Sequence, residues 1–325
     1  MAQAYEGIEH LAVAMRATGF DLDFYQLSGG CCRGDLLSVS LGSLQVLRIH
    51  LSQPILTVGA KNPQTCLFCI SLTPIAAGEV GLQAHGVELG DESVYGLDPV
   101  RDVHLVTPAS YALALLAVPL DTLLHLAARF GMPELQHVLR HHNALQLQMA
   151  SLSCLRSRLD RLFALAISAG EVFATAECRQ WWSELVMAEL MAALVDSFSL
   201  RQGSVRPPAR IDIVKQAERW AFDNPTQPIN LDLLCRHVFA SRRSLIQGFQ
   251  DHLGMGPMAF LKLRRLHGVR ASLLDADPAC TSVADCAEAW GFRSAGHFAR
   301  DYLQLFGESP RQSLRRCPVA RCPSG

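Results

Sequence analysis

Two stretches near the carboxyl end repeat one pattern: residues 230–254 read NLDLLCRHVFASRRSLIQGFQDHLG, and residues 282–307 read SVADCAEAWGFRSAGHFARDYLQLFG. Each stretch begins with a short helical pattern, continues through a tight turn, and ends in a second helical pattern closed by glycine. The residues that can cap these helices are Asn230, Ser241, Ser282 and Ser294, and the closing glycines are Gly254 and Gly307. The repeat predicts two helix-turn-helix units.

The segments around the two units are also helical by pattern, from residue 211 to residue 317. Gly256–Pro257 begins a long helix that reaches about Leu274, because proline suits a first helical turn. Ser309–Pro310 begins a last short helix in the same way. Ser282 and Asp285 have the spacing of a capping box. One long helix therefore connects the two units.

The second helix of the first unit has one apolar face and one polar face. Leu245, Phe249 and Leu253 recur at helical spacing and point inward. The outward set is Arg242, Arg243, Ile246, Gln247 and Gln250. In a major groove, arginine pairs with guanine, glutamine pairs with adenine, and an apolar side chain contacts the thymine methyl group. This face can therefore read a DNA sequence.

The corresponding helix of the second unit has the same division. Its inward residues are Phe298, Tyr302, Leu305 and Phe306, and its outward residues are His297, Arg300, Asp301 and Gln304. Ala295 and Gly296 carry little or no side chain, so the start of this helix can approach a phosphate or a base edge closely. Any single arginine or glutamine is more often a solvated surface residue, but two copies of the unit favour DNA.

Charge supports this interpretation. Residues 1–209 hold 13 Lys and Arg against 19 Asp and Glu, a net charge of −6, whereas residues 210–317 hold 15 against 11, a net charge of +4. The chain as a whole has 325 residues and a net charge of -1. A basic segment on a mildly acidic chain indicates that the last third contacts a polyanion.

Residues 230–316 resemble the DNA-binding domain of the AraC/XylS family of transcriptional regulators. In the first unit, its exit and the connecting helix, the matching residues are Ser241, Leu245, Phe249, Gly254, Pro257, Arg264, Leu273 and Leu274. In the second unit they are Ala287, Gly291, Phe292, Ser294, Phe298, Arg300, Phe306, Gly307, Ser309 and Pro310. Ser313 departs from the family, which commonly has an aromatic residue there, and we expect this change to affect packing of the last helix.

The resemblance implies that the two recognition helices enter successive major grooves of double-stranded DNA, and that RNA polymerase is a partner. By position, the family's base contacts fall on Arg243, Ile246, Gln247, Gly296, His297 and Arg300. It also implies that the other half of the chain senses a small-molecule effector or forms a homodimer, often on a cupin-like barrel. No cofactor is implied.

The first 120 residues read mostly as strand and turn, at 36–49, 55–59, 66–72 and 80–95, which is typical of an antiparallel sandwich or barrel. Helical patterns follow at 121–130, 134–149, 152–169 and 176–200. The last of these carries an apolar stripe of Trp182, Leu185, Val186, Leu190, Ala193 and Leu194. This stripe either packs on its own domain or forms a dimer contact. The expected fold class is α+β, with a strand-rich, cupin-like first part and an all-helical, bilobed second part.

The expected domain organisation follows from these patterns. Residues 1–200 form an effector-sensing and dimerisation domain, and residues 201–210, RQGSVRPPAR, form a linker rich in Gly, Ser and Pro. Residues 211–317 form the DNA-binding domain, and residues 318–325 form a tail.

Several other classes of protein are disfavoured. No apolar run reaches the roughly 18 residues of a membrane span, and no signal peptide is recognisable, so we expect a cytoplasmic protein. The 11 cysteines are scattered, and Cys31, Cys32, Cys66 and Cys69 are expected to be buried thiols rather than a zinc or redox site. The scattered histidines, His141–His142 included, predict no metal site. No catalytic motif is present, so we expect no enzyme. The alternatives are a thiol-transfer DNA-repair enzyme fused to this domain, or an adaptor that does not bind DNA.

Overall fold

The computed structural model describes residues 2–75, 81–198, 210–224, 227 and 230–316. The N-terminal part is strand-rich. Its strands are β1 Ala2–Glu6, β2 Asp23–Gln26, β3 Arg33–Leu41, β4 Leu44–Leu51, β5 Ile55–Gly59, β6 Thr65–Ser71, β7 Leu82–Ala84, β8 Val87–Leu89, β9 Ser93–Tyr95, β10 Val103–Thr107, β11 Tyr111–Pro119 and β12 Ala144–Gln146. Its helices are α1 Ile8–Ala17, α2 Leu120–Arg129, α3 Leu135–His141, α4 Met149–Ser168, a short 3-10 turn η1 Gly170–Ala174, and α5 Ala176–Phe198.

The strands form two antiparallel sheets. The seven-stranded sheet has the order β1-β3-β4-β11-β6-β9-β12, and the five-stranded sheet has the order β2-β5-β10-β7-β8. The central strand β11 is buried on both faces, which explains the long apolar run at this position. Because successive side chains alternate, Leu115 faces the five-stranded sheet while Leu116 faces the helices α2 to α5. The strand-rich α+β architecture expected for the first part is confirmed.

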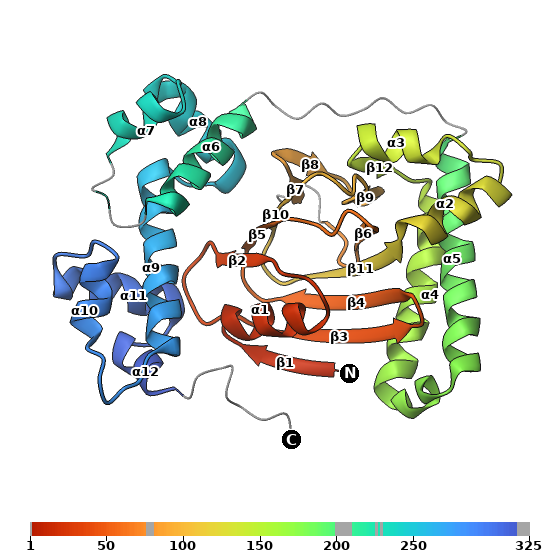
Figure 1. Cartoon of the computed structure of the whole chain (residues 1–325), viewed down its shortest axis with the longest axis horizontal. Coiled ribbons are helices and arrows are strands. Elements are labelled where there is room, and N and C mark those ends of the chain that lie inside the picture. The colour runs from red at the N-terminus through yellow and green to blue at the C-terminus, as the bar shows by residue number, and fades with distance from the viewer. Residues whose placement is uncertain (1, 76–80, 199–209, 225–226, 228–229, 317–325) are drawn as a thin grey trace.

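The C-terminal domain is helical. It consists of α6 Arg210–Asp223, α7 Leu231–His237, α8 Arg242–Leu253, α9 Pro257–Asp275, α10 Val283–Ala289, α11 Ala295–Phe306 and α12 Pro310–Arg315. Figure 1 shows α6 to α12 on one side of the sheets and α4 and α5 on the opposite side. The molecule is therefore layered as long helices, seven-stranded sheet, five-stranded sheet and helical domain. Four hydrophobic clusters fill it.

Several expected elements differ in the structure. The helix expected over 134–149 is wrong in its second half, since α3 ends at His141 and β12 pairs with β9 instead. Helix α1 lies in a region expected to be strand and turn. Its buried residues Ile8, Leu11 and Met15 have helical spacing that could have revealed it. The expected linker at 201–210 lies outside the described residues apart from Arg210, and the tail at 318–325 lies outside them entirely.

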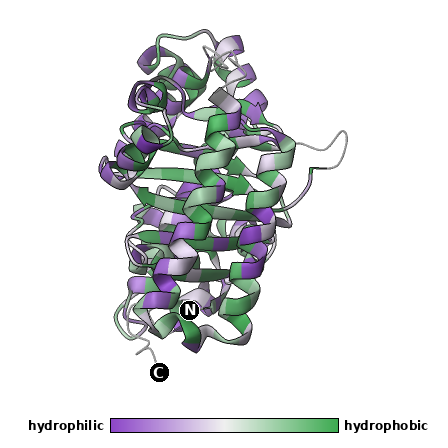
Figure 2. Ribbon diagram, turned by 90° about the vertical axis from the view of Figure 1, so that its right-hand side faces the viewer, coloured by the Kyte–Doolittle hydropathy of each residue, from purple (hydrophilic) through white to green (hydrophobic). Residues whose placement is uncertain are grey.

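The apolar stripe of α5 packs inside its own chain. Trp182, Val186, Leu190, Ala193 and Leu194 are buried in the cluster between α4, α5 and the seven-stranded sheet. Figure 2 views the molecule from the side of α4 and α5, which cover the sheet behind them. Self-packing, one of the two readings of this stripe, accounts for its pattern. None of the described helices is long and apolar enough to span a membrane.

Candidate nucleic-acid interface

Helix α8 is held by a serine cap, an apolar face and a close helix contact. The Ser241 hydroxyl accepts a hydrogen bond from the Ser244 amide at 3.1 Å, and Gly254 ends the helix in the left-handed conformation with φ of 67°. Phe249 is fully buried, with its ring centroid 5.5 Å from that of Phe260. A Cβ at Gly248 would lie 3.1 Å from Val214 of α6, so this glycine permits close packing of the two helices.

The outward face of α8 is exposed at every position expected to face DNA: Arg242, Arg243, Ile246, Gln247 and Gln250. The side chains differ in how they are held. Arg242 donates two hydrogen bonds to Asp232 of α7, at 2.7 and 2.6 Å, so it braces the unit itself. Gln247 donates to Asp251 at 2.6 Å. Arg243 has no hydrogen bond or ion pair to any residue of the described ranges, and its five donors face solvent.

Helix α11 packs through a row of aromatic rings. The centroid of Tyr302 lies 5.6 Å from that of Phe298 and 4.7 Å from that of Phe306, which places all three rings toward α9. The residues expected to approach DNA, Gly296, His297 and Arg300, are exposed. A Cβ at Gly296 would meet no atom within 4 Å, so the start of this helix is open to a ligand backbone.

Two other outward residues of α11 have structural contacts. Asp301 forms an ion pair with Lys262 of α9 at 3.1 Å. The backbone carbonyl of Gln304 accepts a hydrogen bond from the Gly30 amide of the N-terminal part at 3.2 Å. The expected side-chain cap at Ser294 is wrong, because its hydroxyl makes no capping hydrogen bond. The other expected caps, at Asn230, Ser241 and Ser282, are present, and Ser309 forms a full capping box with Gln312.

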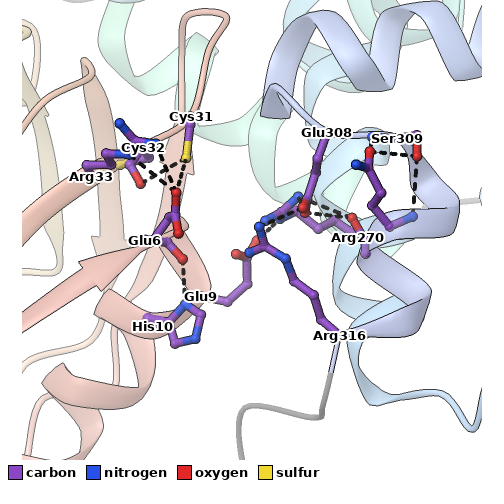
Figure 3. A network of polar contacts seen from close by, with 12 residues as sticks. Glu6, Glu9, His10, Cys31, Cys32, Arg33, Arg270, Glu308, Ser309 and Arg316 are labelled. Atoms are coloured by element: carbon purple, nitrogen blue, oxygen red, sulfur yellow. Dashed lines mark hydrogen bonds and ion pairs between the residues drawn. The ribbon is translucent and has the colours of Figure 1, made fainter.

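A buried polar network fixes the second unit on α9 (Figure 3). Arg270 is 3% exposed and donates to Glu308 at 2.6 Å and to Glu9 of α1 at 2.7 Å. Burial alone would lower the pKa of Arg270, but Glu9 and Glu308 keep it raised. Ser313, fully buried, accepts from the Tyr302 hydroxyl at 2.7 Å and donates to Glu308 at 2.8 Å. Ser313 therefore lies in the packed interior, where the sequence places its effect, and not on the face proposed to approach DNA.

Cys66 and Cys69 lie on opposite faces of the strand β6. Cys66 faces the helix-covered cluster and donates to the Leu97 carbonyl at 3.1 Å, whereas Cys69 faces the five-stranded sheet. Burial raises the pKa of both thiols to about 12. An activated cysteine needs a lowered pKa, so these thiols do not suit a thiol-transfer reaction. Within the described ranges, no three His, Cys, Asp or Glu side chains gather as a metal site.

The fold and the exposed faces define a double helix-turn-helix DNA-binding protein. Residues 234–316 match the protein family described as a helix-turn-helix domain. The chain is 37% identical over 164 residues to the probable thc operon regulatory protein of Rhodococcus erythropolis, covering 50% of this chain and 47% of that protein. It is 30% identical over 133 residues to XylDLEGF operon transcriptional activator 2 of Pseudomonas putida, covering 41% of this chain and 82% of that protein.

A solved structure of a probable AraC family transcriptional regulator from Rhodopseudomonas palustris is 38% identical. The match covers 32% of this chain and 96% of the Rhodopseudomonas palustris chain, with a TM-score of 0.30. The chain belongs to the AraC/XylS family of transcriptional regulators. It spans about half the length or less of the first curated relatives it matches.

Proposed function

We propose that this protein reads a DNA sequence with α8 in one major groove and α11 in the next. On α8 the proposed reading set is Arg242, Arg243, Ile246, Gln247 and Gln250, and on α11 it is Gly296, His297 and Arg300. One observation supports the proposal most: all eight positions are exposed, while the apolar residues between them, Leu245, Phe249 and Phe298, are buried. Within the set, Arg243 and Arg300 are the strongest candidates for base contacts, since neither is paired inside the described part of the chain.

A binding assay tests this proposal. The full chain is titrated against the DNA upstream of its own gene and against unrelated DNA of equal length, at near-physiological salt. Specific regulators prefer their sites by about 10³-fold or more. A preference of that size supports a sequence-specific regulator. Equal binding to both fragments and to genomic operator libraries would contradict it, and no binding to any of them would favour the adaptor alternative.

The proposal extends to a small-molecule effector. A cavity of about 430 Å³ lies where α1 and β2 of the N-terminal part meet α9. Its walls include Phe24, Tyr25, Phe222, Arg264 and Trp290. Arg264 lies 4.4 Å from the centroid of the Tyr25 ring, so this guanidinium already bridges the two parts. A small, largely apolar molecule bound here would contact both parts at once. Quenching of Trp290 fluorescence during a compound screen, lost in Trp290→Phe, is the test.

Two partners complete the proposal. A homodimer would use the outer side of α4 and α5, where Ile167 is 57% exposed and Trp181 is 55% exposed. Sedimentation velocity of the full chain and of Trp181→Glu tests this contact, because a dimer through this face would dissociate in the variant. RNA polymerase is the second proposed partner, and transcription in a purified system with and without this chain tests it.

A further inference from the structure

All four buried histidines of the described residues lie where the N-terminal part meets the helical domain. His85 lies in the turn between β7 and β8, His104 in β10, His252 at the end of α8, and His267 in α9. Their exposed fractions are between 2% and 7%. Because histidine changes its charge near physiological pH, four buried imidazoles at one contact are groups whose protonation would act directly on that contact.

The first three histidines form one cluster across the contact. The rings of His85 and His104 are stacked, with centroids 6.0 Å apart. His104 lies 3.1 Å from Glu218 of α6, so this histidine has an acceptor in the other part. A Cβ at Gly86 would overlap the His252 ring, which shows how closely the β7–β8 turn is packed on α8.

Two of these imidazoles have no hydrogen-bond partner within the described residues. Both ring nitrogens of His85 and both of His252 are buried without a hydrogen bond. Burial lowers the pKa of His85 to about 2, with further contributions from Lys215, Arg101, His104 and Lys61. Burial also lowers the pKa of His252; the other groups that act on it are Asp251, His104, Glu218 and Arg210. Lys215 itself is paired with Asp102 at 3.0 Å, so that carboxylate is already engaged.

His267 is buried at the other end of the contact. It lies 3.2 Å from the backbone carbonyl of Gln26 in β2 and edge-on to the Tyr25 ring. Burial lowers its pKa to about 3, and the neighbouring charges, Arg270 and Arg264, are both positive. The positive charge of a protonated His267 would therefore face two guanidinium groups.

We propose that this contact is a pH-sensitive interface, in which protonation of His85, His252 and His267 separates the helical domain from the N-terminal part. Each of these imidazoles is neutral in the closed form and has an ordinary pKa near 6.5 when exposed. The open form then binds more protons, so the closed form is fully stable above about pH 6.5 and loses stability as the pH falls below it. Between pH 7.5 and 5.5 the opening ratio rises about tenfold for His85 and for His267, and by up to about tenfold for His252.

The interface also holds the ends of both recognition helices. His252 lies at the end of α8, and the Leu305 carbonyl of α11 accepts hydrogen bonds from Gln26 at 2.9 Å and from the Gly30 amide at 3.1 Å. Opening would release both ends from the N-terminal part. Control of DNA binding by this release rests on the proposed function, whereas the opening itself does not.

Hydrogen exchange of the full chain, without DNA, tests the opening. The probe is the Gly30 amide, which is bonded across the interface, and the reference is β4, which is paired on both sides within its sheet. We expect the protection factor of Gly30 to fall at least about 100-fold from pH 7.5 to 5.5 while that of β4 is maintained. An unchanged Gly30 value, or an equal fall in β4 from acid unfolding, would overturn the proposal.

Variants assign the effect to the histidines. In the double variant His85→Asn, His252→Gln the fall in Gly30 protection should be smaller by about 10- to 100-fold, whereas His125→Gln, at an exposed position of α2, should leave it unchanged. Full pH dependence in the double variant would overturn the assignment. Circular dichroism at pH 7.5 checks folding, and the single variant His85→Asn replaces the double one if it does not fold. Opening in a chain that binds no DNA at any pH would refute only the proposed function.

Discussion

The guanidinium of Arg270 in α9 donates to the carboxylate of Glu9 in α1 at 2.7 Å, across 261 residues of sequence. This ion pair joins the first helix of the chain to the helix that carries both DNA-binding units. Because Arg270 is 3% exposed, the ion pair is largely shielded from water. Removal of one charge would therefore deprive the other of a partner that water does not replace. The N-terminal part is thereby fastened to the helix between the two units.

Replacement of Glu9 should destabilise the chain. In Glu9→Gln, Arg270 keeps Glu308 but loses one charged acceptor, so we expect a loss of about 1–3 kcal/mol in the free energy of unfolding. Urea denaturation measures it. The matched control is Glu6→Gln, since Glu6 pairs with Arg33 at an exposed site and should have little effect. Equal losses in the two variants would show that Arg270 does not depend on Glu9.

Removal of Arg243 should weaken specific DNA binding. We expect Arg243→Ala to lose about 1–3 kcal/mol of binding free energy and to relax the preference at one base pair. Fluorescence anisotropy with operators substituted at each position measures both. Arg161→Ala, at an exposed position on α4, is the control for loss of one positive charge. If all sequences lose affinity equally, Arg243 contacts only a phosphate.

Phe239, in the turn of the first unit, is 96% exposed and has φ of 50°. A left-handed conformation costs a residue with a side chain roughly 1–2 kcal/mol, and glycine avoids this at some cost in unfolded-chain entropy. Phe239→Gly should therefore stabilise the chain by about 0.5–1 kcal/mol, as measured by thermal unfolding. Phe239→Ala retains the strain and should change little. A destabilised glycine variant would mean that the ring makes a contact in solution.

Ser313 should be coupled to Tyr302. Ser313→Ala leaves the buried Tyr302 hydroxyl without its acceptor, and we expect a loss of about 1–3 kcal/mol in unfolding free energy. Tyr302→Phe removes the stranded hydroxyl, so the double variant should lose less than the sum of the two single losses. A double-mutant cycle by urea denaturation measures this coupling, and strict additivity would argue against the hydrogen bond.

The helical domain could be predicted from local pattern, whereas much of the N-terminal part could not. Short-range spacing places Leu245 and Phe249 inside and Arg243 outside, since helix periodicity needs no knowledge of distant residues. The expected helix over 134–149 failed because β12 exists only through its pairing with β9, some fifty residues away. Short apolar segments are ambiguous until their partners are known.

The sequence by itself determined the two units, three of their four helix caps and the polar faces of α8 and α11, because all of these depend on residues within a few helical turns. Only the tertiary structure decided that Glu9 meets Arg270, that the β7–β8 turn packs on His252 and that His104 meets Glu218. Such contacts join segments more than a hundred residues apart. Periodicity shows which face of a strand or helix is apolar, but not which other element covers it.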